Sequence, residues 1–195
     1  MQQSSDTMKR LSLELGGNAP FVVFDDADID KAVASAMASK FRNAGQTCVC
    51  ADRFLVHEKV HDEFVEKFAA SASKLVVGSG MDSSTNMGPL IASDAVVKTH
   101  QKVKDAVAEG ARCVVGGSPM EDLGQHFFQP TILTNVSPSS DIWKTETFGP
   151  VAPIVSFSSE DQALELANDS SVGLASYFCT NDLSRAFRFA ERYEI

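Results

Sequence analysis

The chain has 195 residues, of which 44% are hydrophobic, and a formal net charge of −9 at pH 7. A chain of this length can bury a core and form one domain. The acidic balance argues against nucleic acid or an anionic membrane surface as a partner, and no apolar run approaches the roughly 20 residues that cross a bilayer.

The first half of the chain predicts strands and helices in alternation. Residues 21–24 and 54–57 are short apolar runs typical of buried strands. Between them, apolar side chains recur at helical spacing from Ile29 to Phe41, after an aspartate that can cap the helix. A second helix follows, with an apolar stripe from Val60 to Leu75.

The second half continues this alternation after a loop rich in Gly, Ser and Asp at 78–89. A helix with an apolar face from Val96 to Val107 ends at Gly110. The remaining predicted elements are strands at 113–115, 131–133, 151–157 and 174–179, and helices at 160–168 and 183–192. The alternation predicts an α/β fold with a mainly parallel sheet covered by helices on both faces.

The four cysteines, at positions 48, 50, 113 and 179, form neither a disulfide framework nor a zinc site. Cys48 and Cys50 are too close for a Cys-x-x-Cys motif, and no histidine lies nearby in sequence, so we expect no metal. Cys113 and Cys179 are expected to be small buried residues in strands. Free thiols indicate a reducing intracellular compartment, either the cytoplasm or the mitochondrial matrix.

Two segments combine a reactive side chain with glycines. Segment 13–20 reads Leu-Glu-Leu-Gly-Gly-Asn-Ala-Pro and contains Glu14, and segment 41–48 reads Phe-Arg-Asn-Ala-Gly-Gln-Thr-Cys and ends at Cys48. Glycine lets the backbone take unusual angles and approach a ligand closely. A thiol needs a base or a positive local field to become a nucleophile. The two segments therefore predict a nucleophile and a base.

A carboxylate acts best as a base near neutral pH when partial burial raises its pKa. Glu14 lies between Leu13 and Leu15. We expect these leucines to provide such an environment.

A third segment, Glu-Thr-Phe-Gly-Pro at 146–150, follows in the same chain. The three motifs together resemble the NAD(P)-dependent aldehyde dehydrogenase superfamily, from about Lys9 to the C-terminus. The resemblance implies that Cys48 attacks an aldehyde and that Glu14 activates the water that hydrolyses the resulting thioester. The run 40–50 is most similar to the succinate-semialdehyde dehydrogenase branch, where an arginine matching Arg42 binds the distal carboxylate of the substrate.

The resemblance also implies a dinucleotide site. Glu146 matches the glutamate that binds the nicotinamide ribose, and Phe148 matches the aromatic residue packed beside the nicotinamide. Leu15 and Gly16 present their backbone near the same group. NAD or NADP would be bound mainly by an upstream Rossmann-type domain, whose phosphate-binding glycine loop has no counterpart in this sequence.

The resemblance implies that the chain consists of a polar tail or boundary at 1–8 and a catalytic domain at 9–195. Relative to the full enzyme, this domain is truncated at both ends. The resemblance implies that the full-length enzyme is a homodimer or homotetramer acting on a small aldehyde. The isolated fragment is expected to be inactive.

Several alternatives stay open. Cys50 is either a redox partner of Cys48 or a spectator thiol. Arg42 is alternatively an ordinary cation at a helix C-terminus, and Glu146 and Phe148 are alternatively a loop ion pair and a core side chain. The substrate is alternatively another semialdehyde or a neutral aldehyde. The chain is alternatively a fragment without cofactor and with at most ester-hydrolase activity.

Overall fold

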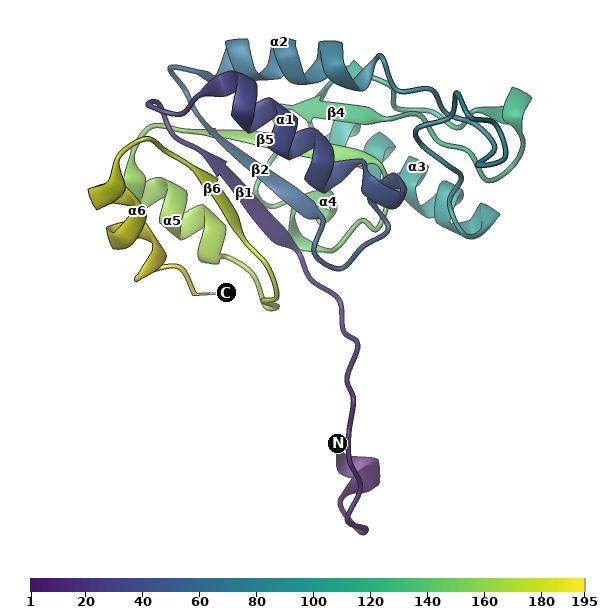
Figure 1. The fold of residues 1–195 in the computed structure, drawn as a ribbon, viewed down its shortest axis with the longest axis horizontal. Helices are drawn as coiled ribbons and strands as arrows, with labels where there is room; N and C mark the ends of the chain where they lie inside the picture. The colour runs from purple at the N-terminus through teal and green to yellow at the C-terminus, as the bar shows by residue number, and fades with distance from the viewer. Residues whose placement is uncertain (195) are drawn as a thin grey trace.

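The structure, a computed structural model, describes residues 1–194 and is built around one six-stranded sheet (Figure 1). Its strands are β1 Ala19–Val23, β2 Ala51–His57, β3 Arg112–Val115, β4 Thr131–Thr134, β5 Val151–Phe157 and β6 Tyr177–Cys179. They lie in the order β3-β4-β5-β2-β1-β6. β3 runs antiparallel to β4, and all other neighbouring strands are parallel.

Helices cover both faces of the sheet, which confirms the predicted fold class. They are α1 Ile29–Lys40, α2 His61–Ala72, α3 Ser93–Ala108, α4 Asp141–Lys144, α5 Glu160–Asn168 and α6 Leu183–Ala190. α1 and α2 pack against each other over one face, while α5 contacts β1 and β2 from the other face with α6 beside it (Figure 1). Parallel neighbours need crossover connections, and these helices supply them.

The neighbouring strands β1 and β2, both inside the sheet, are buried along their whole length. Both faces of a parallel sheet are covered, so such strands are apolar without alternation. The rings of Phe21 on β1 and Phe54 on β2 lie 5.4 Å apart between centroids, and Phe68 of α2 lies 5.4 Å from Phe54. This aromatic cluster packs the middle of β1 and β2 against α2.

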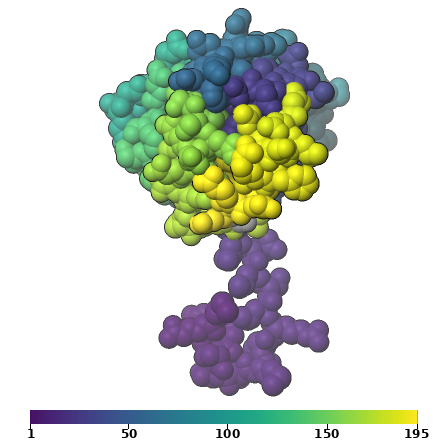
Figure 2. Space-filling model, turned by 90° about the vertical axis from the view of Figure 1, so that its left-hand side faces the viewer, coloured from purple at the N-terminus to yellow at the C-terminus, as the bar shows by residue number. Residues whose placement is uncertain are grey.

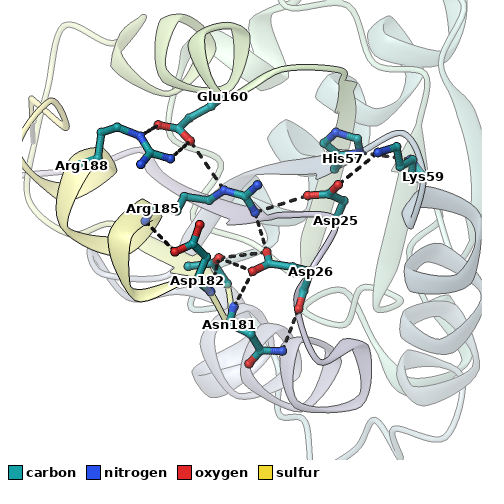
Figure 3. A network of polar contacts seen from close by, with 10 residues as sticks. Asp25, Asp26, His57, Lys59, Glu160, Asn181, Asp182, Arg185 and Arg188 are labelled. Carbon is teal, nitrogen blue, oxygen red and sulfur yellow. Dashed lines mark hydrogen bonds and ion pairs between the residues drawn. The ribbon is translucent and has the colours of Figure 1, made fainter.

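The turns after the carboxyl ends of the parallel strands are joined by an ionic network (Figure 3). Arg185 of α6 contacts Asp26 at 2.6 Å and Asp25 at 3.3 Å in the turn after β1. Glu160, at the start of α5, accepts two hydrogen bonds of 2.7 Å from Arg188. The network therefore fastens α6 to the β1 turn and to α5.

The N-terminal segment leaves the body of the molecule (Figures 1 and 2). It begins with a 3-10 helix at Gln2–Ser4 and continues as extended chain until β1. Its apolar side chains are exposed, whereas Gly17 is buried against the domain.

Three local expectations were wrong. β6 begins at Tyr177, three residues later than predicted. Val107 is 43% exposed, because the buried face of α3 consists of Val96, Thr99, Val103 and Ala106. Cys113 is exposed on the edge strand β3. Cys179 is partly buried, and burial raises the pKa of its thiol to about 11.

Within residues 1–194, no helix combines the length and the apolar character needed to span a bilayer. Over the same range, no three His, Cys, Asp or Glu side chains are grouped so that they could hold a metal ion. Many of the acidic side chains are instead engaged in ion pairs with Lys or Arg.

Candidate active site

Four segments that precede parallel strands converge at the amino edge of the sheet. Gly17 lies before β1, Cys48 before β2, Glu146 before β5 and Leu174 before β6. Together they line a cavity of about 860 Å³, whose wall consists of residues 13–17, 48–49, 144–146 and 171–174. Glu14, Leu15 and Gly16 are therefore brought to the same cavity as Cys48 and Glu146.

Cys48 lies on the loop between α1 and β2, and both ends of this loop are clamped. The Lys40 ammonium lies 2.7 Å from an oxygen of Asp52, and the two side chains are 0% and 4% exposed. The Ser39 hydroxyl accepts a hydrogen bond of 3.0 Å from the N–H of Ala51. An unpaired buried charge is costly, so the ion pair favours this one arrangement of the loop.

The loop turns sharply at Asn43, Ala44 and Gly45, whose φ values of 51°, 53° and 78° lie in the left-handed region. At Gly45 a Cβ atom would lie 2.1 Å from the carbonyl oxygen of Gly149. A side chain at this position would therefore clash with backbone. The glycine of the cysteine motif lets its loop touch the segment 146–150.

The glutamate motif makes equally close contacts through its two glycines. A Cβ atom at Gly17 would lie 2.5 Å from the carbonyl oxygen of Cys48, and one at Gly16 would lie 2.6 Å from Oε2 of Glu146. The N–H of Gly17 donates a hydrogen bond of 3.1 Å to Oε1 of Glu146. All three motifs thus meet through backbone that has no room for side chains.

The expectation that Leu13 and Leu15 bury Glu14 was wrong. Glu14 lines the cavity but is exposed, and the two leucines are 55% and 69% exposed. The reason is that this segment runs as extended chain away from the sheet, and no helix or strand of residues 1–194 packs over it (Figure 1).

Arg42 lines a second, smaller hollow, whereas Cys50 lines neither this hollow nor the Cys48 cavity. Arg42 is exposed in a hollow of about 400 Å³ whose wall also includes Val49 and Tyr177. Val49 borders both hollows, and its carbonyl oxygen accepts a hydrogen bond of 2.6 Å from the Tyr177 hydroxyl. Cys50 is 2% exposed, and both Cys48 and Cys50 are free thiols.

Glu146 and Phe148 are placed differently. Glu146 lines the Cys48 cavity, whereas Phe148 lines a separate hollow of about 510 Å³ beside Asn43, Gln46 and residues 89–91. Phe148 is 42% exposed, which also rules out a core position. Its φ of 50° lies in the left-handed region, which non-glycine residues seldom adopt.

Two contacts of the site have no signal in the local sequence. Lys102 of α3 donates hydrogen bonds of 3.1 Å and 3.2 Å to the carbonyl oxygens of Thr145 and Glu146. Tyr177 reaches Val49 from β6. Helical and strand periodicity predicts only which face a residue occupies, so these partners became visible only in three dimensions.

The fold of this chain is similar to that of proteins with solved structures. A crystal structure of succinate-semialdehyde dehydrogenase from Burkholderia pseudomallei has a TM-score of 0.96 and 53% sequence identity, over 99% of this chain and 40% of that chain. This similarity extends over almost the whole fold described above.

Comparison of sequences leads to the family. The chain is 53% identical over 194 residues to the NADP(+) succinate-semialdehyde dehydrogenase of Escherichia coli (strain K12), covering 100% of this chain and 40% of that protein. It is 50% identical over 194 residues to a glutarate-semialdehyde dehydrogenase of Pseudomonas putida, with the same shares of 100% and 40%. The chain thus spans about two fifths of the length of these relatives. A model of the aldehyde dehydrogenase family matches residues 1–195, and the chain belongs to this family.

Proposed function

We propose that this chain is the catalytic part of a longer NAD(P)-dependent dehydrogenase that oxidises succinate semialdehyde to succinate. The observation that supports it most is the convergence of Cys48, Glu14 and Glu146 on one cavity. The names of the two semialdehyde dehydrogenases that are 50% and 53% identical support the same substrate class.

In this proposal Cys48 is the nucleophile. Its thiolate attacks the aldehyde carbon, forming a carbon–sulfur bond and a thiohemiacetal, which becomes a thioester when hydride leaves the same carbon. The backbone N–H of Cys48 is half of the oxyanion hole. Glu14 removes a proton from the water that attacks the thioester, and the carboxylic acid and the Cys48 thiol are released.

The residues present fit a dinucleotide at this cavity. The Glu146 carboxylate lines it and can accept hydrogen bonds from ribose hydroxyls. Leu15 and Gly16 line the same cavity. Gly16 has no side chain to cover its backbone, and a Cβ atom there would clash with the Glu146 carboxylate. A bound dinucleotide would supply the acceptor for the hydride that leaves the thiohemiacetal carbon. We propose that an upstream domain binds most of the dinucleotide.

The choice between NAD and NADP rests on the relatives, and the Escherichia coli protein named NADP(+)-dependent favours NADP. Residues 9–195 are then a catalytic domain truncated at both ends. A homodimeric or homotetrameric assembly and the cellular compartment stay predictions.

Arg42 supports a substrate with an acidic tail. Its guanidinium is exposed in the hollow that Val49 separates from the Cys48 cavity, and an arginine fork binds a carboxylate through two parallel hydrogen bonds. The main alternative is glutarate semialdehyde, which is one methylene longer. A hydrophobic pocket discriminates one methylene by only about 1–3 kcal/mol, so both substrates need to be measured.

The test is Cys48→Ala in the complete protein, with formation of reduced dinucleotide from succinate semialdehyde as the readout. We expect turnover to be abolished while the thermal unfolding midpoint stays near that of the unsubstituted protein. Cys113→Ala is the matched control, because Cys113 is an exposed thiol outside the cavity, and it should leave turnover unchanged. Near-normal turnover by the Cys48 variant would end the nucleophile assignment.

A further inference from the structure

Lys102 extends from α3 toward the segment that carries Glu146. Its ammonium donates hydrogen bonds to the carbonyl oxygen of Thr145 at 3.1 Å, to the carbonyl oxygen of Glu146 at 3.2 Å and to the Thr145 hydroxyl. It also lies 3.3 Å from Oδ2 of Asp141 in α4. The side chain is 18% exposed, so its ammonium is largely removed from water.

These contacts hold the two carbonyl groups of a segment whose other hydrogen bonds are made by the N–H and hydroxyl of Thr145 to Asp141 and by the Glu146 carboxylate. Within residues 1–194, Lys102 provides the only hydrogen bonds accepted by the carbonyl oxygens of Thr145 and Glu146. The segment follows α4 and precedes β5, so it belongs to neither element. An ammonium has three donors, and here each of them has an oxygen within reach.

The direction of the Glu146 carboxylate depends on this backbone. One of its oxygens accepts the N–H of Gly17 at 3.1 Å, and Gly17 in turn passes close to the carbonyl oxygen of Cys48. A continuous set of contacts therefore runs from α3 through Lys102 and Glu146 to the cysteine loop. Loss of the ammonium would remove the hydrogen bonds to these two carbonyl oxygens, whereas the contact between Glu146 and Gly17 uses other atoms.

We propose that Lys102 is a positioning residue that holds Glu146 in the orientation needed to bind the dinucleotide. This inference rests on the proposed function, in which Glu146 binds the ribose hydroxyls. Lys102 acts only through Glu146 and touches neither the aldehyde nor Cys48. Its removal should therefore weaken dinucleotide binding and leave the intrinsic reactivity of Cys48 intact.

The experiment compares Lys102→Met, Lys102→Arg and Lys104→Met in the complete protein. The dissociation constant of NADPH and of NADH is measured by fluorescence, and the alkylation rate of Cys48 by iodoacetamide is measured by mass spectrometry. Lys104 is the matched control, since it lies two residues further along α3, is exposed, and makes no ion pair among the described residues.

We expect Lys102→Met to raise the dissociation constant about tenfold, because small displacements of a positioning group have large effects on a site. Alkylation of Cys48 and kcat at saturating dinucleotide should change less than about twofold. Lys102→Arg should restore most of the affinity, and Lys104→Met should leave it unchanged. In a Glu146→Ala background, Lys102→Met should have almost no further effect, since two residues that act as one unit are not additive.

An unchanged dissociation constant in Lys102→Met overturns the inference, and so does a full tenfold loss in the Glu146→Ala background. An equal loss in Lys104→Met would also overturn it, because the effect would then belong to the charge of α3. If the unsubstituted protein binds neither dinucleotide, the proposed function is wrong and this inference falls with it.

Discussion

Arg42 is the side chain on which the proposed choice of a carboxylate-bearing substrate depends. It is exposed, lies in the hollow beside Tyr177, and makes no ion pair within residues 1–194. An ordinary helix-terminal cation would interact with the macrodipole of α1 from its last turn, but Arg42 lies two residues beyond Lys40, the last residue of α1. The free guanidinium therefore favours a role in binding a carboxylate.

We expect Arg42→Ala in the complete protein to lower kcat/KM for succinate semialdehyde by about tenfold, and to change kcat/KM for a neutral aldehyde of similar length little. A charge-assisted hydrogen bond contributes about 1.5–3 kcal/mol when shielded, and less at an exposed site. Steady-state kinetics with both aldehydes measure the difference. Arg112→Ala, an exposed arginine on β3, is the control. Equal losses for both aldehydes would show that Arg42 is structural.

Single residues were predictable where their chemistry and their glycine neighbours coincide in sequence. Cys48 and Glu14 were selected in this way and Glu146 through the resemblance to the family, and the structure brings all three to one cavity. Exposure was not predictable, because it depends on what packs over a segment. The leucines beside Glu14 are exposed for this reason, and Phe148 lies in a different hollow from Glu146.

At the scale of elements, the carboxyl edge of the sheet is stabilised by charges. Burial pushes the pKa of Asp26 upward, but hydrogen bonds from Thr180 and Asn181 and the nearby Arg185 outweigh it, so its pKa lies below the ordinary value of 3.8. The hydrogen bonds from Arg188 likewise lower the pKa of Glu160 below 4.5. Carboxylates with lowered pKa stabilise the fold above their unfolded-state pKa, and this stability is lost as pH falls through the folded-state pKa.

We expect Arg185→Met to reduce the free energy of unfolding at pH 7 by about 1–3 kcal/mol, because the guanidinium bonds to Asp26 and lies 4.7 Å above the Phe24 ring. Since part of the acid-sensitive stability is then gone, the variant should lose less further stability than the unsubstituted protein between about pH 6 and pH 3. Urea unfolding at both pH values measures this.

Arg192→Met is the control for this network. Its ion pair with Asp161 has side chains that are 50% and 81% exposed, and such pairs contribute about 0–1 kcal/mol. An equal loss in the free energy of unfolding in both variants would mean that the Arg185 network stabilises the fold no more than an ordinary surface ion pair.

Helices and strands were predictable where period and capping agree. α1 begins after Asp28, whose side chain accepts the N–H of Lys31 as an N-cap, and α5 spans the predicted residues 160–168. The four-residue helix α4 shows no period in sequence, since it is shorter than two turns. The antiparallel direction of β3 also has no local signal, because it depends on pairing with β4.

The two ends of the parallel strands carry different features of the molecule. Open α/β sheets usually bind ligands at the carboxyl ends of their strands. Here that edge holds the Arg185 network (Figure 3), and the candidate catalytic segments meet at the amino edge. The cavity at the amino edge has a wall made partly of exposed, extended chain around Glu14. This wall has no packed support within residues 1–194.

We therefore expect the isolated 195-residue chain to fold but to form no reduced dinucleotide from succinate semialdehyde. Its core is extensive and includes the buried strands β1 and β2, which should give a cooperative unfolding transition by circular dichroism. The relatives are about two and a half times longer, and the proposed upstream domain would bind most of the dinucleotide. Cys48 should still be alkylated by iodoacetamide, because it is only partly buried.

The complete protein, assayed in parallel, should be active. Dinucleotide reduction by the pure 195-residue chain would contradict its assignment as a truncated catalytic domain, and would mean that the cavity around Cys48 and Glu146 binds the cofactor without further support.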